Sequence, residues 1–152
     1  MTAWKAQYSE WAGRLDSAVS EVFESMLERN CTPVEETPAV DHSISAQILF
    51  SGAIRGECML FASRSVAQVT AEALLGVTSE AAESMVEDAI GELCNMIAGG
   101  WKSKLGPEQA ASAISPPLIS TLQGPGNVQR TEDSFRRFYS FEGHVFGVEM
   151  VF

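Results

Sequence analysis

A regularly spaced group of polar and small residues could support chemistry in this chain. Its members follow one another at steps of four, three and four positions: Asp88, Glu92, Asn95 and Gly99. Because an α-helix turns by about 100° per residue, such steps place side chains on one face of a helix. A helix over these positions would present two carboxylates and an amide in a row, directed away from the core that the helix covers. This row is the strongest candidate for a functional site.

The chemistry open to the row follows from its two central side chains. An asparagine does not titrate usefully, so Asn95 cannot be a general base, but it can accept a hydrogen bond from a water and fix its direction. GTPases use a glutamine in this way to align a water for attack on a phosphoryl group. Glu92 would repel a phosphoryl group unless it binds a cation on a partner. The pair therefore predicts docking through Glu92 and water positioning by Asn95; the alternative is that both are solvated surface residues.

The rest of the chain offers little other catalytic equipment. It has two histidines, His42 and His144, and three dispersed cysteines, with no spacing typical of a zinc site. It contains neither a glycine-rich phosphate loop ending in Gly-Lys-Ser/Thr nor a Gly-x-Ser-x-Gly motif. We therefore expect no metal and no cofactor of the protein's own, and enzyme classes that carry their own nucleophile are disfavoured.

Length and charge restrict the class of protein further. A chain of 152 residues fits one domain over residues 1–152. The net charge of −10 argues against nonspecific binding to nucleic acid or to an anionic membrane. Solubility is the simpler explanation of this charge, and contact with a cation on a partner is the sharper one. Dispersed cysteines and the lack of a visible signal or membrane-spanning segment predict a cytoplasmic protein.

The element that must hold the row is a long amphipathic helix, predicted over residues 80–105. Apolar side chains recur on its opposite side at steps of three and four. Thr78 or Ser79 can cap its N-terminus. The apolar stripe consists of Val86, Ile90, Leu93, Ile97, Trp101 and Leu105.

Further helices are predicted from the same kind of periodicity. A first helix covers residues 2–30, and an extended connector with two prolines follows over residues 31–41. A short helix, capped by Ser63 or Ser65, ends at Gly76.

Alternating apolar residues predict an antiparallel sheet. Residues 43–50 and 57–62 form one hairpin, and residues 134–141 and 144–152 form another through the two-residue turn Glu142-Gly143. Prolines favour an edge, a bulge or a loop against the helix at 113–120, and loops are predicted at 106–107 and 124–126. Together these elements predict an α+β domain with helices packed on a largely antiparallel sheet.

The motif Asp88-x-x-x-Glu92-x-x-Asn95 resembles that of the CheX/CheC/FliY family of chemotaxis phosphatases. The resemblance extends over residues 89–99 and reappears in residues 114–119, Ile-Ser-Pro-Pro-Leu-Ile. A single such helix is similar to the single-site CheX branch, because CheC-type members often carry two copies. The family's usual proline would fall at Leu118, whereas this chain has Pro116 and Pro117.

The resemblance implies a phosphatase that acts on phosphorylated CheY-type receiver domains. It assigns pairing with a receiver lysine to Glu92 and positioning of the attacking water to Asn95, with Asp88 and Pro117 in supporting roles. The phosphorylated aspartate and the Mg²⁺ would belong to the receiver, and a homodimer formed through sheet edges is expected. The alternatives are a noncatalytic module of the same fold that sequesters a receiver, and a small-molecule binding domain.

Overall fold

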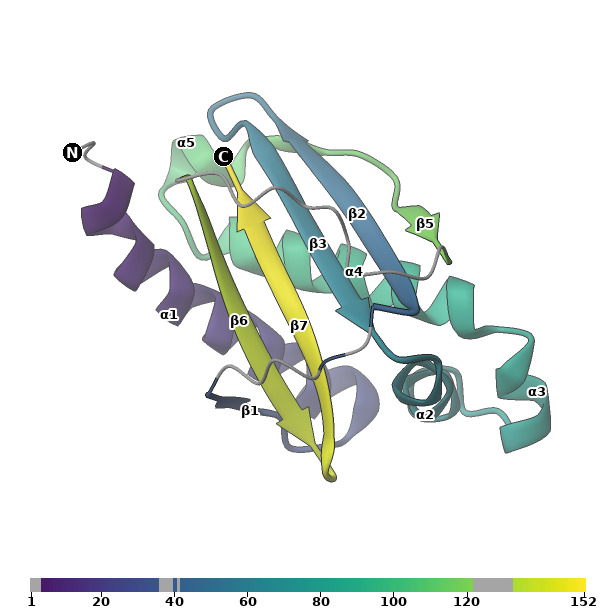
Figure 1. Cartoon of the computed structure of the whole chain (residues 1–152). Coiled ribbons are helices and arrows are strands. Elements are labelled where there is room, and N and C mark those ends of the chain that lie inside the picture. The colour runs from purple at the N-terminus through teal and green to yellow at the C-terminus, as the bar shows by residue number, and fades with distance from the viewer. Residues whose placement is uncertain (1–3, 36–39, 41, 122–132) are drawn as a thin grey trace.

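A seven-stranded antiparallel sheet carries helices on one face (Figure 1). The structure is a computed structural model and describes residues 4–35, 40, 42–121 and 133–152. Its strands are β1 (Thr32–Val34), β2 (Ile44–Ser51), β3 (Gly56–Ala62), β4 (Ala113–Ile114), β5 (Leu118–Ser120), β6 (Ser134–Phe141) and β7 (His144–Val151). Its helices are α1 (Trp4–Val22), the π-helical turn η1 (Phe23–Leu27), α2 (Arg64–Leu75), α3 (Ser79–Glu83), α4 (Val86–Ser103) and α5 (Pro107–Ala110). This architecture confirms the predicted α+β class.

The strand order is β1-β6-β7-β3-β2-β4, and β5 also pairs with β2. Both predicted hairpins are present, β2 with β3 and β6 with β7. The β6–β7 turn has positive φ at both central residues, 49° at Glu142 and 81° at Gly143. A turn of this kind matches the right-handed twist of the flanking strands, and glycine adopts such a φ without strain. The sequence signal at Glu142-Gly143 was therefore sufficient to place this hairpin.

Short strands with nearby prolines form the two edges of the sheet. On one side β1, which contains Pro33, pairs with β6. On the other side β4 and β5 both pair with β2, and Pro116 and Pro117 lie between them. Of the alternatives predicted for residues 113–120, an edge, a bulge or a loop against the helix, the structure has two short edge strands, with Pro117 between them close to α4. The prediction of an extended connector over residues 31–41 needs a correction, because residues 32–34 form strand β1.

The prediction of one long helix over residues 80–105 is wrong, because the chain turns at Ser84–Met85 and forms two helices, α3 and α4. Met85 has φ −114° and ψ 10°, and Ser84 turns its hydroxyl back to the carbonyl of Ala81 at 3.0 Å. The break lets α3 pack beside α2, where Ala82 joins Ala71 and Ala89 in a small buried cluster. Figure 1 shows α3 beyond the start of α4 and next to α2. Tertiary packing between the helices therefore overrides a continuous helical pattern.

Two other predictions differ from the structure, and two more concern residues that it does not describe. The first helix ends earlier than Asn30, because η1 is followed by Glu28 in the left-handed conformation with φ 56°. Of the loop predicted at 106–107, Gly106 does lie in the connection after α4, but Pro107 begins α5, where its missing N–H is not needed. The loop predicted at 124–126 and the start of the first helix at Thr2 lie outside the described residues.

The caps predicted for the short helix and the following one are present. Ser63 accepts a hydrogen bond from the amide of Val66 at the start of α2, and Gly76 ends α2 with φ 63°. Thr78 caps α3. Within the part of the chain that the structure describes, no helix is both long and apolar enough to cross a membrane.

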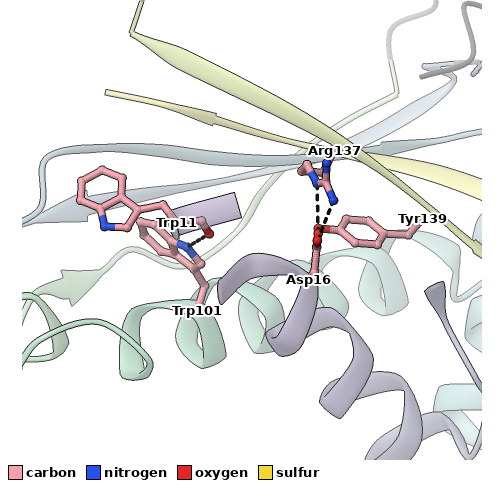
Figure 2. Close-up of polar contacts among 5 residues, drawn as sticks. All are labelled: Trp11, Asp16, Trp101, Arg137 and Tyr139. Atoms are coloured by element: carbon pink, nitrogen blue, oxygen red, sulfur yellow. Dashed lines mark hydrogen bonds and ion pairs between the residues drawn. The ribbon is translucent and has the colours of Figure 1, made fainter. Parts of the chain in front are cut away.

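Two polar contacts fix α1 in place, as Figure 2 shows. The carboxylate of Asp16 accepts hydrogen bonds from Arg137 at 2.6 and 3.1 Å and from the hydroxyl of Tyr139 at 2.7 Å. The indole of Trp101 on α4 donates to the carbonyl of Trp11 at 3.0 Å. Burial, followed by the hydrogen bond to Asp16, raises the pKa of Tyr139, so its hydroxyl remains a donor at neutral pH. Together these contacts tie α1 to β6 and to α4.

Replacing Asp16 by alanine should destabilise the fold by about 2 kcal/mol. The change leaves the buried Tyr139 hydroxyl without its acceptor, and a hydrogen bond to a charged group is worth roughly 1.5–3 kcal/mol. The measurement is urea unfolding, with a lower midpoint and an unchanged m-value expected. Arg14→Ala is the control, because its pair with Glu10 is exposed and should contribute less than about 1 kcal/mol. Equal stability of the two variants would contradict this account of α1.

Candidate functional site

The apolar side of α4 lies against the sheet and fixes the position of the helix. Its side chains of Leu93, Ile97 and Trp101 are at most 1% exposed. The approach to the sheet is close, because the Cys94 sulfur lies 3.6 Å from the backbone oxygen of Ala46 on β2. Burial of each large apolar side chain contributes roughly 1.5–3 kcal/mol. Any group on the opposite side of α4 is therefore held by a well-anchored support.

The row predicted from the sequence is on that opposite side. Asp88 and Glu92 are exposed, and Asn95 is half-buried. The side chains of Glu92 and Asn95 make no hydrogen bond or ion pair with any residue that the structure describes. Unpaired groups on a rigid helix remain available to a partner and to water.

Asp88 differs from the other two members of the row, because it lies in the first turn of α4. A carboxylate there interacts favourably with the positive end of the helix dipole. The sequence placed this positive end at Thr78 or Ser79, but the break at Ser84–Met85 moves it to Val86. Stabilisation of the helix start is therefore a sufficient reason for an aspartate at position 88, without any contact to a partner.

The segment that contains the two prolines runs beside the row. A Cβ atom built on Gly91 would lie 3.1 Å from Ile119 Cδ1 and 3.3 Å from Pro117 Cγ, and one built on Gly99 would lie 4.0 Å from Ile114 Cδ1. The segment thus passes α4 in the opposite direction, from Gly99 towards Gly91. Asn95 is four residues from each glycine and so lies between them on the same side of the helix. This placement explains why Asn95 is half-buried.

Pro117 lies close to the row, because it packs against Gly91, the residue that precedes Glu92. The next residue, Leu118, is 68% exposed and pairs with Gln47 of β2. Successive residues of a strand point to opposite faces, so Ile119, and not Leu118, faces α4. The one-residue departure from the family's proline pattern therefore still leaves a proline against the helix.

Sequence reasoning missed the roles of Gly91 and, in part, Gly99. Gly91 is buried in the interior of α4, where glycine costs about 1 kcal/mol relative to alanine. The signal that could have found both residues is the pattern Gly91-x-x-x-Asn95-x-x-x-Gly99, with a small residue one turn away on each side of the amide. Their close neighbours come from a segment distant in sequence, so the pattern alone does not identify what approaches.

The thiols do not supply an alternative nucleophile. Cys31, Cys58 and Cys94 are buried and unpaired. Burial raises the pKa of Cys31 to about 12. A hydrogen bond with Cys94, followed by burial, raises the pKa of Cys58 well above its ordinary value. Buried, protonated thiols are poor nucleophiles.

Metal-binding arrangements are likewise not found in the ranges that the structure describes. No group of three or more His, Cys, Asp or Glu side chains there is placed to hold a metal ion. The row by itself offers exposed carboxylates for docking and a neutral acceptor for a water.

Several solved structures share this fold. The chemotaxis protein CheX from Vibrio vulnificus is 19% identical, with a TM-score of 0.77 over 93% of this chain and 98% of that one. A CheC-like superfamily protein from Shewanella sp. PV-4 is 16% identical, with a TM-score of 0.72 over 99% and 98%. The CheX-CheY-BeF3-Mg²⁺ complex from Borrelia burgdorferi contains a chain that is 19% identical, with a TM-score of 0.69 over 93% and 96%. No curated protein matches the sequence in a direct comparison.

The fold is thus that of the CheX and CheC class of chemotaxis proteins. Residues 44–139, more than half of the chain, match the model of the family described as chemotaxis phosphatase CheX. The chain therefore belongs to the CheX family of chemotaxis phosphatases. The matched residues include α4 and the proline-containing segment beside it.

Alanine at Gly91 and alanine at Gly99 should have different effects, although both replace a glycine inside α4. At Gly99 the added methyl meets only an ordinary contact, so the change should stabilise the protein by up to about 1 kcal/mol. At Gly91 the methyl forces Pro117 and Ile119 to move by a few tenths of an ångström, so this gain should be reduced or reversed. Urea unfolding measures the stability of each variant.

Amide NMR spectra provide a second measurement of the same contact. Residues 115–120 should shift in the Gly91→Ala spectrum and not in the Gly99→Ala spectrum. If both variants gained the same stability and neither moved these residues, the segment would not depend on Gly91.

Proposed function

We propose that this protein hydrolyses the aspartyl-phosphate of a CheY-type receiver domain. The observation that carries the proposal is the pair Glu92 and Asn95, which stand unpaired and one turn apart on the anchored helix of a CheX-family chain. The amide directs a water, and the carboxylate docks on a cation of the receiver. The aspartate that carries the phosphoryl group, and the metal, belong to the partner.

The reaction is an in-line displacement at phosphorus. The water oxygen forms a bond to phosphorus while the bond from phosphorus to the aspartate oxygen of the receiver breaks, which releases inorganic phosphate and a free aspartate. The Asn95 carboxamide oxygen accepts a hydrogen bond from the attacking water and so fixes its line of approach. It does not take the proton, because an amide is not basic; that proton leaves with the phosphate product. Mg²⁺ on the receiver neutralises charge on the transferring group.

Glu92 is proposed to pair with a lysine of the receiver. The charge of its carboxylate would oppose the approach of a phosphoryl group unless a cation intervened, and a lysine placed between them removes this conflict. The exposed position of Glu92 suits a contact formed only in the complex. The similar protein from Borrelia burgdorferi is seen together with CheY and Mg²⁺, which supports a partner of this type here.

Asp88 and Pro117 are proposed as supporting residues and not as reacting groups. Asp88 stabilises the start of α4, and Pro117 packs against the helix at Gly91, one turn before Asn95. Because the partner is a receiver domain, we place the reaction in the cytoplasm.

Replacing Asn95 by alanine should reduce the rate of phosphate release about a hundredfold, because a misplaced water loses the orientation that the amide supplies. The assay mixes substoichiometric protein with phosphorylated receiver and Mg²⁺ and follows the phosphate released. Binding of the receiver should be nearly unchanged, since Asn95 acts on the water. A folded Asn95→Ala protein that kept the full rate would show that another group directs the reaction.

The same assay separates catalysis from sequestration. A catalyst clears many equivalents of phosphorylated receiver, whereas a sequestering module protects or retains at most one. Glu92→Gln should raise KM through weaker docking, and Glu108→Gln on α5, also exposed but away from the row, is the matched control. Clearance of one equivalent or less would favour the sequestering role.

A homodimer is proposed from the family resemblance, with a sheet edge as its interface. The β1 edge and the β4–β5 edge are the candidates, and both are short and contain or adjoin prolines. Sedimentation of the full chain should give twice the 16.4 kDa mass of one copy. A single-copy mass across the micromolar range would argue for a monomer.

A further inference from the structure

A cleft lies near the C-terminal end of α4, beyond Glu92 and Asn95, between α1, α5 and the turn that joins β2 to β3. Its volume is about 250 Å³. It continues into a shallower hollow of about 380 Å³ that also reaches Lys104, just beyond the end of α4. Lys104 is about 18 Å from Glu92 along the helix axis at 1.5 Å per residue. Residues that line the deeper part include Gln7, Trp11, Ile54, Arg55, Gln109 and Phe152.

The walls of the cleft are aromatic and firmly held. The ring of Trp11 packs edge-on against buried Trp101, with 5.8 Å between the ring centroids. The ring of Phe152 lies 5.1 Å from that of Trp11 and also contacts Trp101. Preformed apolar walls with a few polar groups are typical of small-molecule sites. The cleft is therefore lined by aromatic side chains that neighbouring rings hold in place, although Trp11 itself is only 8% exposed.

One cation in the cleft is not neutralised by a neighbour. Arg14 pairs with Glu10 at 3.1 Å, and Lys104 pairs with Glu21 at 2.8 Å. Arg55, by contrast, makes no ion pair or hydrogen bond with the residues that the structure describes. It is thus a free guanidinium in a chain whose net charge is −10.

Two neutral donors accompany this guanidinium. The carboxamides of Gln7 and Gln109 line the same cleft, and neither makes a side-chain hydrogen bond within the described ranges. A guanidinium binds a carboxylate through two parallel hydrogen bonds, and a carboxamide can donate a further one. One unpaired cation suits one negative charge, because the strongly acidic chain opposes a more highly charged ligand.

We propose that this cleft binds a small planar organic anion, an aromatic monocarboxylate. The ring lies against Trp11 and Phe152, and the carboxylate meets Arg55 with support from Gln7 or Gln109. The site is separate from Glu92 and Asn95 and does not depend on the proposed phosphatase reaction.

The test is a titration of the full chain with 2-naphthoate, followed by NMR at the side-chain amides of Gln7 and Gln109 and at the indole of Trp11. Saturable shifts centred on these groups are expected. Arg55→Gln should weaken binding about tenfold, the effect of losing one charged hydrogen bond. Arg64→Gln removes the same charge from an exposed position on α2 outside the cleft and should leave the affinity unchanged.

Two further compounds test the chemistry on the unmodified protein. Naphthalene-2-carboxamide has the same ring without the charge, and cyclohexanecarboxylate has the charge without the aromatic ring; both should bind at least tenfold more weakly. No saturable shift in the cleft at millimolar 2-naphthoate would overturn the proposal. Equal binding of the neutral amide, or unchanged binding by Arg55→Gln, would also overturn it.

Discussion

The close packing of α4 against β2 and β3 of the sheet is the constraint on which the rest of the structure depends. Small residues, Cys94 and Ala98 on the helix and Ala46 on β2, allow the two layers to approach, and larger side chains seal the contact on both sides. Because the interior is close-packed, a helix held in this way has little freedom to shift or rotate. Its outer side is thereby a rigid platform, although only the buried side contributes to the hydrophobic core.

The same helix is flanked by elements that adapt to it. The break at Ser84–Met85 lets α3 fold onto α2, so α4 begins where the packing against the sheet begins. On the other side, the segment from Ile114 to Ile119 follows the helix and pairs with β2, and glycines give it room. The helix that holds the candidate site is thus enclosed along its length by its neighbours, while the row remains open.

Local patterns in the sequence predicted much of the fold and the row itself. The alternation in β2 and the turn at Glu142-Gly143 depend on residues adjacent in sequence, and so does the spacing from Asp88 to Asn95. The helix break was not predicted, because no proline or glycine marks Ser84–Met85, and the contact that positions α3 is with Ala71 on α2. The role of Gly91 and the cleft at Arg55 were missed for the same reason, since each depends on segments brought together only by folding.

Burial is graded along the row, and this gradation fits a division of labour in the proposed reaction. Asn95 is half-buried and has a short side chain, and the segment of Pro117 passes the same side of the helix. Glu92 is one turn away, exposed and longer, and can adjust to a cation on an approaching surface. A group that aims a water gains from restriction, because rate depends steeply on geometry. A group that docks gains from mobility until the complex forms. In the proposed reaction, Asn95 and Glu92 thus supply water orientation and docking, and the receiver supplies the phosphoryl group and the metal.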